Sequence, residues 1–155
     1  MKKLCGLLIV ALVAALAGVI WYTVLRGSVA EGDDGRTAIL LPPAERNLVL
    51  AEMRQFLEAS QGIVEAIASN DMQRVVKLAR EVGTVDMSKI PASLFRRLPG
   101  SFKKLGFDTH DAFLKLADDV EKGMDREHVI KRLGEIMLNC TTCHAGWRID
   151  PEPEQ

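Results

Sequence analysis

The sequence predicts an all-α protein, an antiparallel four-helix bundle with up-down-up-down connectivity that follows an N-terminal transmembrane or signal helix. Three observations predict it. A long uncharged apolar run opens the chain of 155 residues, and four amphipathic segments with helical spacing follow it. No segment alternates apolar and polar residues over a useful length, so no sheet is expected. The chain is long enough for one domain and an appendage.

Charge is unevenly distributed along a chain that is nearly neutral overall, with 20 Lys and Arg against 21 Asp and Glu. Residues 1–30 contain Lys2, Lys3 and Arg26 but no acidic residue, so the remainder is mildly acidic. Because there is no basic excess and aromatic residues make up only 5% of the chain, the composition excludes nucleic acid as a partner. Three cysteines are too few for a disulfide scaffold.

The N-terminal element, residues 1–27, is predicted to be a membrane anchor or a signal segment. Residues 4–25 carry no charge, and this length matches the roughly 20 residues that a helix needs to cross a bilayer. Trp21 and Tyr22 stand where an interfacial aromatic belt would lie, and the N-terminal lysines favour an N-inside orientation. A cleaved signal is the alternative, since Ser28-Val29-Ala30 satisfies a small-x-small cleavage rule. Both interpretations predict export.

Two shorter features complete the N-terminal part. Cys5 is interpreted as a small buried apolar residue. Residues 28–41, with Glu31-Gly32-Asp33-Asp34-Gly35 near their centre, are predicted to form a flexible polar tether.

The body, residues 42–150, begins with two predicted helices. Ser69-Asn70-Asp71 ends the first helix and caps the second, which Gly83 terminates. The first helix starts after Pro42-Pro43, and its apolar or small residues alternate three and four apart, which is the period of a packed helix. These residues are Val49, Met53, Phe56, Ser60, Ile63 and Ile67.

The second half of the body contains a long connection and two more predicted helices. Residues 84–106 are rich in Pro and Gly and are expected to form the connection, with a short helical turn at Ala92–Arg97. The third helix is expected from about Thr109 to Gly123. The fourth is expected to start at Asp125 and to end with a cysteine motif.

That motif, Cys140-Thr141-Thr142-Cys143-His144, is the C-x-x-C-H signature of covalent haem c attachment. Its spacing lets two thiols reach the two vinyl groups on one porphyrin edge while the adjacent imidazole reaches the iron. A thioredoxin-like dithiol would stand at the start of a helix after a strand, whereas this motif ends a predicted helix. A structural zinc site needs four ligands, and only His110 and His128 could supplement these three. The motif therefore predicts one covalently attached haem c with its iron.

A single C-x-x-C-H near the C-terminus of an exported chain of four helices resembles the cytochrome c′ family, including its low-spin His/Met members. Trp147 and Arg148 extend the likeness, since they are similar to that family's C-x-x-C-H-x-x-aromatic-Arg ending. The resemblance covers residues 42–148. It implies Cys140 and Cys143 as thioether sites and His144 as the proximal iron ligand. It also implies Arg148 near the haem edge or propionates, with Trp147 beside the cofactor.

The sixth iron ligand separates electron transfer from gas binding. Met53 is the first candidate, because antiparallel packing brings the start of the first helix to the haem end and the low-spin relatives take their Met from this region. Family members often carry an Arg one turn earlier, where this chain has Val49. His110 is the alternative ligand; its other interpretations are a propionate contact and a core histidine. Met87 lies in the connection.

The expected function is one-electron transfer without enzymatic chemistry, on the periplasmic side of a bacterial inner membrane, with periplasmic or membrane-bound redox partners. If Met53 is only core packing, the alternative is a five-coordinate binder or sensor of NO or CO. A structural membrane-anchored bundle without a cofactor would require the motif to be accidental. Family members often form homodimers, although the apolar stripes here do not single out a dimer face.

Overall fold

The structure is a computed structural model that describes residues 2–153, apart from the side chains of Lys2, Leu4, Cys5, Thr23 and Val24. The interpretation of Cys5 as a buried residue therefore lies outside the described side chains. The described chain is mostly helical and carries one small sheet.

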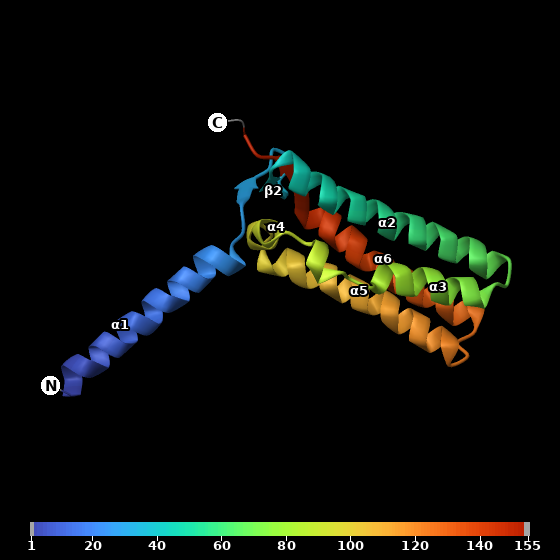
Figure 1. The fold of residues 1–155 in the computed structure, drawn as a ribbon, viewed down its shortest axis with the longest axis horizontal. Helices are drawn as coiled ribbons and strands as arrows, with labels where there is room; N and C mark the ends of the chain where they lie inside the picture. The colour runs from blue at the N-terminus through green and yellow to red at the C-terminus, as the bar shows by residue number, and fades with distance from the viewer. Residues whose placement is uncertain (1, 154–155) are drawn as a thin grey trace.

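The N-terminal helix α1 (Lys2–Ile20) continues into a π-helical turn, η1 (Trp21–Leu25), and extends away from the rest of the molecule (Figure 1). Its apolar side chains are exposed at successive positions and therefore on every side of the helix; Leu7 and Leu12 are each 69% exposed. Among the residues that the structure describes, no helix combines the length and the apolar character needed to cross a membrane.

A three-stranded sheet of order β1-β2-β3 joins the two ends of the body. β1 (Val29–Glu31) pairs antiparallel with β2 (Thr37–Leu41), and β3 (Trp147–Pro151) pairs parallel with β2. The expectations of no sheet and of a flexible tether at residues 28–41 are therefore wrong. The reason is burial, because Ile39 and Leu41 are fully buried against the helices.

Four longer helices lie between β2 and β3 in the chain: α2 (Pro43–Ala68), α3 (Met72–Gly83), α5 (Gly100–Glu121) and α6 (Arg126–Gly146). They lie alongside one another in Figure 1, and α3 packs against both α2 and α5. The predicted cap at Asp71 is confirmed. The Asp71 carboxylate accepts from the backbone N–H of Arg74 at 2.9 Å, and Asp125 caps α6 in the same way.

The connection between α3 and α5 is shorter than predicted. It contains a 3₁₀ turn, η2 (Met87–Lys89), and the expected short helix α4 (Ala92–Arg97). The third long helix begins at Gly100 rather than near Thr109. Pro99 stands just before its first turn, where a missing N–H costs nothing, and α5 continues through Gly106 because one glycine inside a helix costs only about 1 kcal/mol.

The buried apolar side chains form two clusters at opposite ends of the helices. The larger cluster surrounds Phe113, Leu116 and Val129, which are at most 1% exposed. The smaller one lies beside the sheet and contains Ile39, Leu41, Val49, Leu94 and Phe102. The C-x-x-C-H motif lies at this second end, which we call the sheet end.

Candidate functional site

A cavity of about 450 Å³ lies at the sheet end between α2, α5 and α6. We call it the motif cavity, because Cys140, Cys143 and His144 line it from α6 while Met53 lines it from α2. The remaining lining is largely apolar and includes Val49, Leu50, Phe56, Leu57, Phe102 and Leu105. Its size falls in the range of cofactor sites, which run from about 300 to 1,000 Å³.

Helix geometry explains why the motif residues line one cavity. They occupy the last two turns of α6, and residues three and four apart lie on the same helix face. Both thiols are free and half-buried, and burial raises the pKa of each; for Cys143 the neighbouring Cys140 adds to the rise. A reactive dithiol needs a thiol pKa below the ordinary value, so this environment does not favour redox dithiol chemistry.

His144 is exposed, and its ring makes no hydrogen bond or ion pair with the described part of the chain. The polypeptide holds its backbone instead. Arg36 donates from Nη1 to the His144 carbonyl at 3.2 Å and to the Trp147 carbonyl at 3.5 Å. The same guanidinium hydrogen-bonds the Asp34 carboxylate, which lowers the pKa of Asp34 to about 2. The loop between β1 and β2 therefore fixes the end of the motif helix and leaves the imidazole unengaged.

Met53 lies on α2 and is half-buried against the smaller cluster, as is Cys143. The two residues reach the motif cavity from different helices. Met137 also lines this cavity but stands on α6, the helix that carries His144. Met87 is 52% exposed in η2 and does not line the motif cavity. The arrangement brings one thioether, from Met53, to the cavity from a helix other than that of His144.

His110 occupies a different environment. Its ring is buried, Nδ1 lies 2.7 Å from the Val82 carbonyl oxygen, and Nε2 lies 3.0 Å from a Glu52 carboxylate oxygen. Burial, the largest single influence, opposes its protonation, but the Glu52 and Val82 bonds outweigh it and raise the pKa of His110 above its ordinary value. His110 does not line the motif cavity, and iron ligation through Nε2 would require its hydrogen bond to Glu52 to break.

Trp147 and Arg148, on β3, do not line the motif cavity either. Arg148 pairs with Asp33, Asp34 and Asp150, and the Asp150 hydrogen bond is the main reason that its pKa is raised. The Trp147 ring meets Phe102 edge-on, with centroids 6.2 Å apart. Trp147 thus stands behind the cavity wall that Phe102 forms, and Arg148 fastens β3 to the loop before β2.

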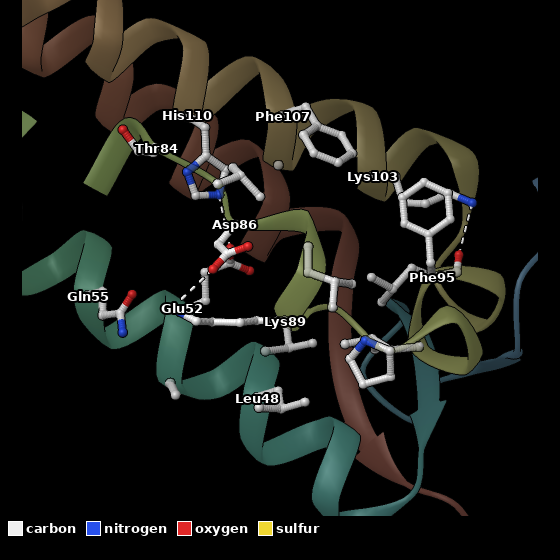
Figure 2. A pocket seen from close by; sticks show the side chains of 18 of the residues that line it. Leu48, Glu52, Gln55, Thr84, Asp86, Lys89, Phe95, Lys103, Phe107 and His110 are labelled. Carbon is white, nitrogen blue, oxygen red and sulfur yellow. Dashed lines mark hydrogen bonds and ion pairs between the residues drawn. The ribbon is translucent and has the colours of Figure 1, made fainter. Parts of the chain in front are cut away.

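A second cavity, of about 370 Å³, was not anticipated from the sequence (Figure 2). We call it the anchor-side cavity. It lies between α2, α4, α5 and residues 84–91, and its lining includes Glu52, Asp86, Phe95, Phe107 and His110. These side chains come from segments far apart in the chain, and no local pattern links them.

No group of three or more His, Cys, Asp or Glu side chains that could hold a metal ion occurs within the described residues. Comparison of the chain with protein-family models, with curated proteins and with solved structures found no match.

Proposed function

We propose that this chain is an exported, membrane-anchored monohaem c-type cytochrome that carries single electrons. The observation that carries the proposal is the motif cavity, which Cys140, Cys143 and His144 line from α6 and Met53 lines from α2. Two thiols, one thioether and one imidazole, which has no hydrogen-bond partner among the described residues, form the donor set of a His/Met haem c.

The residues present fit that group. Cys140 and Cys143 would hold haem c through thioether bonds, with His144 and Met53 as the two protein ligands. When bound, the haem iron supplies a reversible one-electron change of oxidation state. The protein's contribution is to keep water away with the apolar walls at Val49, Phe56 and Phe102 and to keep the coordination constant, so that little reorganises as an electron arrives or leaves.

The finer architecture belongs to the same proposal. We infer that α2, α3, α5 and α6 form a four-helix bundle of the cytochrome c′ type, to which the sheet of β1, β2 and β3 is an addition. Support comes from the order of the helices, the short turns between α2 and α3 and between α5 and α6, and the position of the motif at the end of the last helix. The alternative function is a five-coordinate binder of NO or CO, in which Met53 would only pack in the core.

Covalent haem staining and optical spectra test the proposal. Cys140→Ala/Cys143→Ala should abolish the stain. The wild-type protein should show a low-spin spectrum that carbon monoxide changes slowly or not at all, and Met53→Ala should become high-spin and bind carbon monoxide at once. Met137→Ala is the matched control, because Met137 lines the same cavity from the helix of His144. A high-spin wild-type spectrum would reject Met53 ligation and favour gas binding, and retained stain in the double variant would reject haem c.

We further propose that residues 4–25 attach the protein to the inner membrane from the periplasmic side. Apolar side chains exposed around the whole of α1 support this, since water is an unfavourable environment for such a surface. The test is alkaline carbonate extraction of membranes together with the intact mass of the mature protein. An anchored chain stays in the pellet at full length. A mass that begins after Ala30 would identify a cleaved signal instead.

A further inference from the structure

The anchor-side cavity lies next to the motif cavity. Val49, Glu52, Phe102 and Gly106 line both. One layer of side chains therefore separates the two spaces, a separation across which an electron passes readily. No sequence motif predicts a function for the anchor-side cavity.

The same cavity is also placed beside the proposed anchor. Leu94, Phe95 and Leu98, from α4 and its C-terminal end, line it. The segment that leaves η1 packs on α4, because the Ser28 N–H donates to the Arg97 carbonyl at 2.7 Å. Gly27 has φ 69°, and a Cβ there would lie 2.5 Å from the same oxygen, so this contact is too close for any other residue. A lipid-soluble molecule near the anchor would meet this end of the body first.

The cavity carries one polar pair suited to a neutral hydroxyl donor. The His110 side chain is only 9% exposed and engages one oxygen of the Glu52 carboxylate. The other Glu52 oxygen makes no hydrogen bond within the described part of the chain, and the side chain is 44% exposed. In Figure 2 the pair lies beside Asp86 at one side of the cavity. Asp86 is paired with Lys89 at 3.1 Å, so the second Glu52 oxygen is the acceptor that we assign to a ligand hydroxyl.

The opposite wall is aromatic. The rings of Phe95 and Phe107 line the cavity with centroids 6.4 Å apart and an interplanar angle of 52° (Figure 2). Lys103 lies over Phe95, with Nζ 4.5 Å from the ring centroid. Aromatic side chains prefer to pack against a flat ring, at 4.5–7 Å between centroids. A flat, neutral ring would pack against the aromatic wall, and hydroxyl groups at its edge would donate to Glu52.

We propose that the anchor-side cavity binds the head group of a membrane quinol, and that this quinol donates electrons to the haem. The inference rests on the proposed function for its electron acceptor. Oxidation of one quinol breaks its two O–H bonds and yields the quinone, two electrons and two protons. Each electron reduces one ferric haem to the ferrous state, so one quinol serves two copies of the protein. The two protons are released to solvent.

Binding is measured first, on the full-length haem-loaded protein in detergent micelles. The probe is a tritiated benzoquinone with a ten-carbon tail, with decanoic acid as the tail-only competitor. Val85→Trp fills the anchor-side cavity without touching the motif cavity and should weaken binding at least about tenfold; Leu48→Trp, on the other wall, serves if that variant misfolds. The exposed Val64 lines neither cavity, so Val64→Trp is the matched control and should bind like wild type.

A second pair of variants tests the polar contact, measured with the reduced probe. Glu52→Gln should weaken binding about tenfold, because a hydrogen bond to a charged group is replaced by one to a neutral group. Glu58→Gln, on an exposed part of the same helix, is its control. Stopped-flow reduction of the ferric haem by the quinol should slow in the same variants, whereas reduction by ascorbate should keep its wild-type rate in Val85→Trp.

Three outcomes would overturn the inference: no saturable binding, wild-type binding by both Val85→Trp and Leu48→Trp, or equal displacement by decanoic acid, which would show that only the tail is recognised. Probe binding does not depend on iron ligation. A failure of the proposed function would therefore appear as a wild-type protein without covalent haem stain, or with a high-spin spectrum, that still binds the probe. A failure of this inference would appear as a stained, low-spin wild-type protein without specific probe binding.

Discussion

The same helices α2, α5 and α6 build two ends of the molecule that differ in how completely they are filled. At the end away from the sheet, side chains alone fill the interior, and Phe113, Leu116 and Val129 are at most 1% exposed. At the sheet end there are two cavities. Thiol, imidazole, thioether and carboxylate side chains are among the groups that line them. Protein interiors are normally close-packed, so a cavity bordered by thiol, imidazole and thioether side chains is the basis on which we place the proposed function at the sheet end.

The largest effect should come from removing the thiols. Cys140→Ala/Cys143→Ala should lose all covalent haem and should speed amide hydrogen exchange at the end of α6, because the motif cavity then has nothing to fill it. Exchange around Phe113 should stay slow, since that cluster is complete without a cofactor. Mass spectrometry of exchanged peptides from the wild type and the variant makes the comparison. Equal loss of protection at both ends would show that the two ends unfold as one unit.

Truncating one phenylalanine at each end should give the next largest effect. Phe113→Ala should lower the free energy of unfolding by about 3–5 kcal/mol, because it opens a void in a closed core. Phe102→Ala should cost less, because Phe102 already borders both cavities and its removal only enlarges existing space. Urea unfolding followed by circular dichroism measures both. Equal costs would mean that the sheet end is as tightly packed as the other.

Stability should depend on pH through His110, at the sheet end. Its folded-state pKa is raised above the ordinary 6.5, so protonation stabilises the folded state. This contribution is complete below about pH 6.5 and is lost as pH rises through the folded-state pKa. The wild type should therefore lose more melting temperature between pH 5.5 and pH 8.5 than His110→Gln does. The control is His128→Gln, at the exposed start of α6. Its melting temperature should fall more between pH 5.5 and pH 8.5 than that of His110→Gln.

The smallest effect should come from the surface of the closed end. Arg80 bridges Asp118 and Glu121 at 2.7 Å to each, but all three side chains are close to half exposed. Exposed ion pairs contribute little and are screened by salt. Arg80→Ala should therefore shift the melting temperature slightly at low ionic strength and not at all in about 1 M NaCl. A large, salt-resistant loss would show that the closed end depends on this bridge rather than on its apolar core.

The sequence predicted what periodicity and local chemistry control. Helical spacing located α2 and α6, Asp71 was identified as a cap and Asp125 as the start of a helix, and the short helix Ala92–Arg97 was predicted with its observed bounds. The C-x-x-C-H spacing singled out the residues that line the motif cavity on α6. Met53 followed from antiparallel packing of helices, which is a coarse rule that places whole turns rather than side chains.

Long-range contacts could not be predicted in this way. β1 and β2 are only three and five residues long, too short for a period-two pattern, and β3 owes its strand to a partner over a hundred residues away. The predicted connection extends to Gly106, whereas α5 runs through that residue. The Glu52–His110 pair joins two helices, and nothing local to either residue indicates it.

The parallel pairing of β2 with β3 has a consequence for the order in which the protein matures. Arg36 donates to the carbonyls of His144 and Trp147 and lies 111 residues before Trp147, so this contact forms only after all the residues between them have been synthesised. Such distant pairing forms slowly, because the entropy of closing a long loop must be overcome first. Until the sheet closes, the end of α6 lacks the Arg36 contacts, and on the proposed function this is the interval in which haem would be attached to its thiols. Closure of the sheet would then secure the finished product, giving the chain an interval for modification that ends by itself.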